Sequence, residues 1–116
     1  MEYSAEDYFN RGLAKCSLGD YNGAIKDFNK AIELNPQFEN AYYNRGNAKG
    51  RLVDKQGAIQ DFNKAIEINP KYADAFNNRG NVKNNLGDKE GACLDWSKAG
   101  ELGAMEAYEM IKKYCK

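Results

Sequence analysis

Small and apolar side chains recur along this chain every three or four residues, which is the period of a helix with one buried face. The clearest example is a pair of adjacent stretches. The first stretch contains, at helical spacing, Ala41, Tyr42, Arg45, Ala48, Lys49 and Leu52. The second contains Ala58, Ile59, Phe62, Ala65 and Ile66. The pattern predicts two amphipathic helices joined by a short turn.

The same hairpin pattern occurs three times at a constant spacing along the chain. Gly12, Gly46 and Gly80 mark this spacing, and residues 5–38 share 20 identical positions with residues 39–72. The third unit, residues 73–103, loses the pattern after Ala99. Residues 104–115 then predict one more helix, with Ala104, Ala107, Tyr108, Ile111 and Cys115 on one face. We expect an all-α stack of three hairpins with a capping helix, forming a single domain over residues 1–116.

Residues at the expected helix ends support these boundaries. Ser4 and Asp7 form a capping-box pattern before the first helix. The second helix of each unit begins after an aspartate that can accept backbone N–H groups, namely Asp20, Asp54 and Asp88. Proline stops the second helices at Asn35-Pro36 and Asn69-Pro70. Val53 stands where the other turns have glycine, so we expect a differently shaped turn there.

Each unit pairs a glycine in its first helix with a large aromatic residue in its second. A glycine inside a helix costs roughly 1 kcal/mol relative to alanine, so three at one register suggest close packing. The expected occupants of that space are Phe28, Phe62 and Trp96, which recur at the same spacing as the glycines.

Charged residues also repeat once in each unit. The first helices carry Arg11, Arg45 and Arg79, and one turn later Lys15, Lys49 and Lys83. The second helices carry Asp27, Asp61 and Asp95 directly before the aromatic residue. We expect each aspartate to pair with the arginine of its own hairpin, because two cations at positions i and i+4 would otherwise repel. Separate solvated charges are the alternative.

The pattern resembles the tetratricopeptide repeat. In the second unit the residues that carry this resemblance are Tyr42, Gly46, Ala58, Phe62, Ala65 and Pro70. The resemblance covers residues 5 to about 104 and implies a right-handed superhelix with a capping helix. It also implies a concave groove, lined by the first helix of each unit, that binds a partner protein or an extended peptide. The Asn-Arg-Gly-Asn sequences at 44–47 and 78–81 are similar to repeats of bacterial type.

The resemblance places a set of polar and aromatic residues in that groove. The candidate peptide-binding residues are Asn10, Asn44, Asn78, Asn47, Asn81, Tyr43, Phe9, Asn77 and Arg51. Asn10, Asn44 and Asn78 share one register of the repeat and are similar to the asparagine ladder of the O-linked N-acetylglucosamine transferase superhelix. An amide side chain has two donor hydrogens and an acceptor oxygen, which match a peptide unit. Asparagine is also common there without a ligand, and Phe9 could pack between helices instead.

One subfamily binds chaperone C-terminal carboxylates through a clamp of lysine, arginine and asparagine. Of that clamp this chain retains Asn44, while the other clamp positions hold Phe9, Leu13, Asn40, Asp74 and Asn78. The sequence therefore does not predict a chaperone-tail adaptor.

Composition narrows the function classes. The chain has no histidine, and its carboxylates repeat at structural positions, so we expect no enzyme, no metal site and no cofactor. Lys plus Arg and Asp plus Glu both total 17, which gives no general attraction to nucleic acid or to an anionic membrane. The sequence favours a protein-interaction scaffold.

Self-association is the alternative function, because Tyr108, Met110, Ile111 and Tyr114 of the capping helix could cover a second copy and form a homodimer. The start of the chain does not resemble a signal peptide, so we expect a cytoplasmic location. A fragment of an exported protein would look the same, which leaves the periplasm open. Cys93 and Cys115 would come close, so a disulfide is conceivable in an exported protein, whereas we expect reduced cysteines if the protein is cytoplasmic.

Overall fold

The computed structural model describes residues 2–116, and in this range it contains seven helices and no strand. They are α1 (Ala5–Ser17), α2 (Tyr21–Leu34), α3 (Glu39–Arg51), α4 (Lys55–Ile68), α5 (Ala73–Asn85), α6 (Lys89–Glu101) and α7 (Glu106–Tyr114). This confirms the all-α repeat fold. The capping helix is shorter than residues 104–115, because Gly103 has a φ of 108° and Ala104 lies in the turn before α7.

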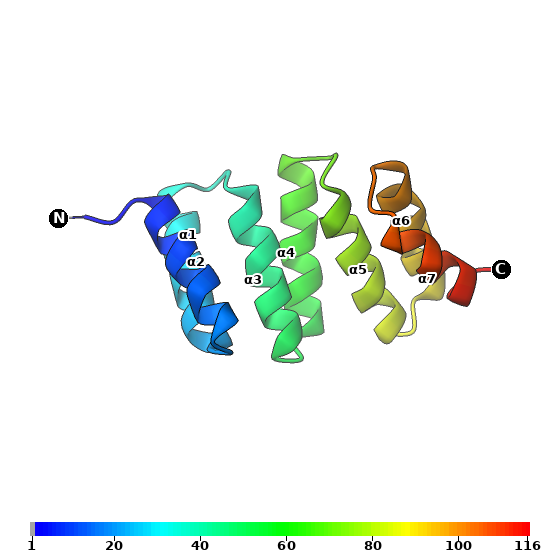
Figure 1. Cartoon of the computed structure of the whole chain (residues 1–116), viewed down its shortest axis with the longest axis horizontal. Helices are drawn as coiled ribbons and strands as arrows, with labels where there is room; N and C mark the ends of the chain where they lie inside the picture. Colours follow the sequence, from blue (N-terminus) through cyan, green and yellow to red (C-terminus); the bar gives the residue numbers. More distant parts are fainter. Residues whose placement is uncertain (1) are drawn as a thin grey trace.

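The hairpins lie side by side in one row, with the two ends of the chain at opposite ends of the row (Figure 1). The molecule is elongated, with principal extents of 55 × 25 × 20 Å. Each second helix packs on the first helix of the next hairpin, as α2 does on α3 and α4 on α5. The first helices also contact each other, α1 with α3 and α3 with α5. None of the described helices has the length and apolar character needed to span a bilayer.

The helix ends form as the sequence predicts. The Ser4 hydroxyl accepts a hydrogen bond from the Asp7 N–H, and the Asp7 carboxylate accepts one from the Ser4 N–H. The aspartates before α2, α4 and α6 each accept a hydrogen bond from the backbone N–H three residues later. Because these caps recur at one register, all three hairpin turns place their second helix in the same way.

The prediction of a different turn at Val53 is wrong. Val53 has a φ of 66°, in the same left-handed region as Gly19 at 80° and Gly87 at 89°. Its N–H donates to the Gly50 carbonyl at 3.0 Å, and the Asp54 N–H donates to the Lys49 carbonyl at 2.9 Å. These bonds match those of the other turns, so the turn and the Asp54 cap outweigh the steric cost of a β-branched side chain in this conformation.

The close approach of glycine and aromatic residues is confirmed. Phe28, Phe62 and Trp96 are the largest fully buried side chains. A Cβ atom added at Gly46 would lie 2.9 Å from Phe62 Cε1, and one added at Gly80 would lie 2.9 Å from Trp96 Nε1. Each hairpin therefore closes around one ring that rests on the backbone of the first helix, and a larger residue than glycine would displace it.

The predicted charge pairs form in every hairpin, and lysine joins them. In each hairpin the arginine Nη2 lies close to the aspartate Oδ1. The distances are 2.8 Å for Arg11–Asp27, 2.7 Å for Arg45–Asp61 and 2.7 Å for Arg79–Asp95. The second carboxylate oxygen lies 3.0, 3.2 and 3.2 Å from the ammonium of Lys15, Lys49 and Lys83. All three aspartates are buried. The carboxylate thus removes the repulsion between the two cations and ties the two helices together.

The arginines also connect neighbouring hairpins. Arg45 Nη1 donates to Asn29 Oδ1 and Arg79 Nη1 donates to Asn63 Oδ1, both at 2.8 Å. Arg11, in the first hairpin of the row, lies over the rings of Tyr3 and Tyr8, with its Cζ atom 5.3 and 5.2 Å from their centroids. The contact with Tyr8 recurs in the other hairpins, where the Arg45 Cζ atom lies 5.5 Å from the Tyr42 centroid and the Arg79 Cζ atom lies 5.4 Å from the Phe76 centroid.

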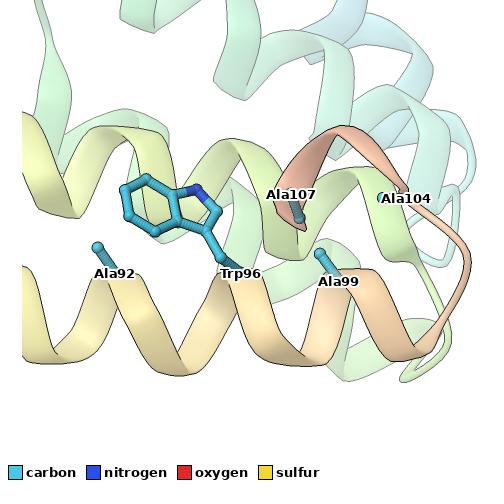
Figure 2. Packing of buried hydrophobic residues seen from close by; sticks show 5 residues of the cluster. All are labelled: Ala92, Trp96, Ala99, Ala104 and Ala107. Atoms are coloured by element: carbon cyan, nitrogen blue, oxygen red, sulfur yellow. The ribbon is translucent and has the colours of Figure 1, made fainter. Parts of the chain in front are cut away.

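The capping helix α7 closes the last hairpin. Ala92, Trp96 and Ala99 of α6 meet Ala104 and Ala107, and the indole lies beside α5 (Figure 2). Met110, Ile111 and Tyr114 pack against this cluster, and the Tyr114 ring stacks on Trp96 with centroids 5.7 Å apart. Of the two states left open for Cys93 and Cys115, the structure contains the disulfide, with a Cα–Cα distance of 6.0 Å. The disulfide attaches the end of α7 to α6.

Candidate functional site

The candidate binding residues lie on α1, α3 and α5, along the face where these three helices contact each other. We call this the groove face and define it by Asn10, Asn44, Asn78 and the candidate residues around them. The structure does not leave all of these side chains free. Some are joined to each other, others pack in the interior, and a third group is open to solvent.

A hydrogen-bonded network joins α3 and α5. The Asn78 amide donates to the Tyr43 hydroxyl and to Asn47 Oδ1, both at 2.9 Å. Both amide hydrogens of Asn78 are thereby used, whereas its Oδ1 remains an acceptor. Burial raises the pKa of the Tyr43 phenol, which stays neutral at pH 7. The network fixes the position of one ladder residue relative to the neighbouring repeat.

Asn40, named above as a clamp position, and Tyr72, which was not predicted at the groove, extend this network. Tyr72, the last residue before α5, donates its hydroxyl hydrogen to Asn40 Oδ1 at 2.7 Å. Its ring packs on Tyr43 with centroids 4.9 Å apart. Tyr72 and Asn40 are separated by 32 residues. Their contact could have been predicted only from the repeat, because the stacking of copied units brings the end of one unit near its own start.

Two candidate asparagines serve the interior of the third hairpin. Asn81 Oδ1 accepts a hydrogen bond from the Trp96 indole N–H at 2.9 Å. Asn77 is buried, and its Oδ1 has no hydrogen-bond partner among residues 2–116. Asn77 occupies the register of Phe9 and Tyr43 in the other units. The third unit therefore has a buried amide where the others have an aromatic ring.

Phe9 packs between helices, which is one of the two alternatives left open by the sequence. Its ring centroid lies 5.8 Å from that of Phe28 and 4.8 Å from that of Phe38. Tyr43 packs in the same way on Phe62 at 5.8 Å. These rings are half-buried and form the floor of the groove face rather than open pockets.

Asn10 and Asn44 remain largely available. Asn10 is exposed, and its side chain makes no hydrogen bond within the described part of the chain. Asn44 donates one hydrogen to the Asn40 carbonyl at 2.8 Å, which leaves its other hydrogen and its Oδ1 free. The number of unpaired amide hydrogens thus falls from Asn10 in the first unit to Asn44 in the second and Asn78 in the third.

A cavity of about 420 Å³ opens between the ends of α1 and α3. Its polar wall contains Ser17, Tyr21, Asn44, Asn47 and Arg51. Arg51 was predicted to line the groove, but Tyr21 and Cys16 were not. The Arg51 guanidinium carbon lies 5.3 Å from the centre of the Tyr21 ring, so a second helix contributes to the site.

Three family models match the chain in overlapping stretches. Their descriptions are TPR repeat for residues 12–53 and Tetratricopeptide repeat for residues 39–72 and 62–93. The match over residues 39–72 coincides with the second repeat unit. This chain is a tetratricopeptide-repeat (TPR) protein. No protein in the curated collection of sequences matches it.

Solved structures of TPR proteins superimpose closely on this one. One is the first TPR of Spaghetti (RPAP3) bound to HSP90 peptide SRMEEVD, with a TM-score of 0.92 and 27% identity, covering 96% of this chain and 90% of that one. Two structures of MamA are 29% identical, with TM-scores of 0.85 and 0.80, and cover 90% and 96% of this chain. This chain spans 62% and 58% of those two MamA chains.

Proposed function

We propose that this TPR protein is an interaction scaffold that holds an extended segment of a partner protein on its groove face. The TPR repeats support the general role, and the similar RPAP3 domain is bound to a peptide. The observation that carries the proposal is the row of asparagines at one register, two of which retain unused amide groups on the groove face.

The free amide groups define what the ladder would recognise. Asn10 offers both donors and an acceptor, Asn44 offers one donor and an acceptor, and Asn78 offers an acceptor alone. A peptide backbone presents alternating N–H and C=O groups, so it can satisfy all three. With first helices about 10 Å apart, the groove face spans about 30 Å, which fits roughly eight extended residues. Such binding would depend weakly on the sequence of the partner.

The chaperone peptide of the RPAP3 domain is not our proposed ligand. Phe9, Leu13 and Asp74 occupy positions where the chaperone-binding subfamily carries clamp residues. Phe9 is packed between Phe28 and Phe38, and Asp74 places a negative charge where a carboxylate-binding group would be needed.

A pull-down tests the ladder directly. The bait is the full chain, compared with the triple variant Asn10→Ala, Asn44→Ala, Asn78→Ala. A matched control is Lys26→Ala, Gln60→Ala, Leu94→Ala, which also changes one register of all three units, at positions on the second helices. We expect the groove variant to lose a partner that the control retains. Identical partners for all three baits would contradict the ladder.

Self-association through α7 has less support. Met110, Ile111 and Tyr114 pack on their own third hairpin, and the disulfide holds the helix there. Of the apolar residues expected to cover a second copy, Tyr108 is exposed and the other three are half-buried. Light scattering after size exclusion would separate the two functions, since a mass that rises with concentration would favour self-association.

The Cys93–Cys115 disulfide supports an oxidising location for the proposed scaffold. Disulfides persist in secreted and periplasmic proteins and are rare in the cytoplasm. We therefore propose the exported alternative over the cytoplasmic one. Free-thiol labelling of the protein in its native compartment would test this, with one reactive thiol expected per chain, from Cys16.

A further inference from the structure

Several of the residues that line the cavity beside Arg51 are not copied in the next repeat. In the next inter-repeat space the residues at the registers of Arg51 and Tyr21 are Asn85 and Lys55. The arginine–tyrosine pair therefore occurs between the first and second hairpins and is not repeated between the second and third. Because the hairpin interiors copy so closely, this departure is local to the groove face and changes its chemistry at one place.

The Arg51 guanidinium is available to a ligand. Arg51 is exposed, and no carboxylate among residues 2–116 lies within ion-pair distance of it. The carbonyls of Ala48, Lys49 and Gly50 in the last turn of α3 already accept backbone hydrogen bonds. The arginine is therefore not needed to satisfy that helix end. Stacking over Tyr21 orients the planar group while leaving its N–H edge free.

The other walls favour an anion. None of the residues that line the cavity is acidic. Asn47 uses its Oδ1 to accept from Asn78 and also interacts with the Tyr43 hydroxyl, so its amide nitrogen is the group that can donate to a ligand. Burial raises the pKa of the Cys16 thiol, so this group adds no negative charge at neutral pH. The cavity thus combines one cation with unused donors.

We propose that this cavity binds a carboxylate of the peptide on the groove face, through the Arg51 guanidinium and the Asn47 amide. An arginine and a carboxylate match as two parallel N–H···O bonds, which gives direction as well as attraction. The site would fix the register of a peptide that the asparagine ladder holds without sequence preference. This inference rests on the proposed function, since it assigns one side-chain or terminal group of the same ligand.

The test uses small carboxylates and the ¹⁵N-labelled full chain. Three probes are titrated: N-acetylalanine, with a free α-carboxylate; N-acetylaspartate N-methylamide, with a side-chain carboxylate; and N-acetylasparagine N-methylamide, which is neutral. The signals followed are the Arg51 Nε–H and the Asn47 side-chain amide. We expect saturable shifts with the two carboxylates, at millimolar affinity, and none with the neutral probe. The tighter of the two carboxylates identifies a chain terminus or an acidic side chain as the source.

Variants make the assignment specific. Arg51→Gln should weaken carboxylate binding by about tenfold or more. Arg51→Lys, which keeps the charge but not the planar group, should weaken it less, and Lys26→Gln on α2 should leave it unchanged. Equal shifts with the neutral probe, or a wild-type titration for Arg51→Gln, would overturn the proposal. Because no partner protein is used, failure here is distinct from failure of the ladder in the pull-down.

Discussion

The interiors of the three hairpins and the groove face differ in how closely one repeat copies the next. In the interiors, the arginine–aspartate distance is 2.8, 2.7 and 2.7 Å in successive units. On the groove face, one register holds Phe9, then Tyr43, then a buried Asn77. The comparison teaches that the copied interior contacts build the frame, whereas on the groove face the side chains around the copied asparagines can change from unit to unit without disturbing that frame.

The largest effect should come from the buried ring of the central hairpin. Phe62→Ala should lower the free energy of unfolding by about 3–5 kcal/mol, because Phe62 is fully buried against Gly46. Urea denaturation followed by circular dichroism measures this. Asn44→Ala on the groove face is the matched control, with a change within about 0.5 kcal/mol. Similar losses for both variants would remove the distinction between frame and groove.

The Cys93–Cys115 disulfide should have the second-largest effect on the free energy of unfolding. It lies at the end of the row formed by the last hairpin and α7. It closes a loop with a sequence separation of 22 residues, so Cys93→Ser should cost about 3 kcal/mol. Denaturation with and without a reducing agent checks this. Cys16→Ser is the control, because Cys16 is a free thiol. A wild-type protein indifferent to reduction would show that α7 is held by packing alone.

Asp61→Asn tests the charge network of the central hairpin. The change leaves Arg45 and Lys49 facing each other without a carboxylate, and we expect a loss of about 2 kcal/mol. This lies below the loss for fully buried pairs because the side chains of Arg45 and Lys49 are 18% and 23% exposed. A loss under about 0.5 kcal/mol in denaturant unfolding would mean that the pair acts like a solvated one.

Asp27→Asn in the first hairpin should lower the free energy of unfolding less than Asp61→Asn does. The effect should depend on pH in a defined way. Burial raises the pKa of Asp27, but hydrogen bonds and charge from Arg11 and Lys15 more than offset this, so the pKa lies below its ordinary value. Its contribution is therefore present above the unfolded pKa, about 4, and is lost as the pH falls through the folded pKa. Between neutral and acid pH, the melting temperature should change less for Asp27→Asn than for wild type. Equal pH dependence would argue against a stabilising role for the Asp27 charge.

Val53→Gly should give the smallest change, a gain of about 1 kcal/mol. Valine at a φ of 66° is strained, whereas glycine is not, and Val53 is exposed, so little packing is lost. The reverse change, Gly19→Val, is the matched control and should cost a similar amount, since it meets no atom within 4 Å but has a φ of 80°. Thermal unfolding of both variants compares them, and a destabilised Val53→Gly would contradict the explanation.

These contrasts also explain what the sequence alone could predict. The caps at Asp20, Asp54 and Asp88 and the glycine–aromatic contacts follow from residues at fixed spacing within one hairpin. The turn at Val53 was predicted wrongly because local propensity opposes it, while the bonds of the whole hairpin impose it.

The groove face was less predictable because its contacts cross between hairpins. Asn78 bonds to Tyr43 and Asn47, which lie 35 and 31 residues away. The sequence placed these residues on one face but could not show which amide groups they consume. Tyr21 was missed for a related reason, since it belongs to a second helix yet reaches Arg51 at the groove.

The central claim is that a partner lies along the groove face. The most direct test is to map the segment captured in the pull-down onto the ¹⁵N-labelled chain by NMR. We expect shifts in the side-chain amides of Asn10, Asn44 and Asn78 and small changes along α2, α4 and α6. Shifts confined to α6 and α7, with the three amides unmoved, would contradict the claim and assign partner binding to the capped end.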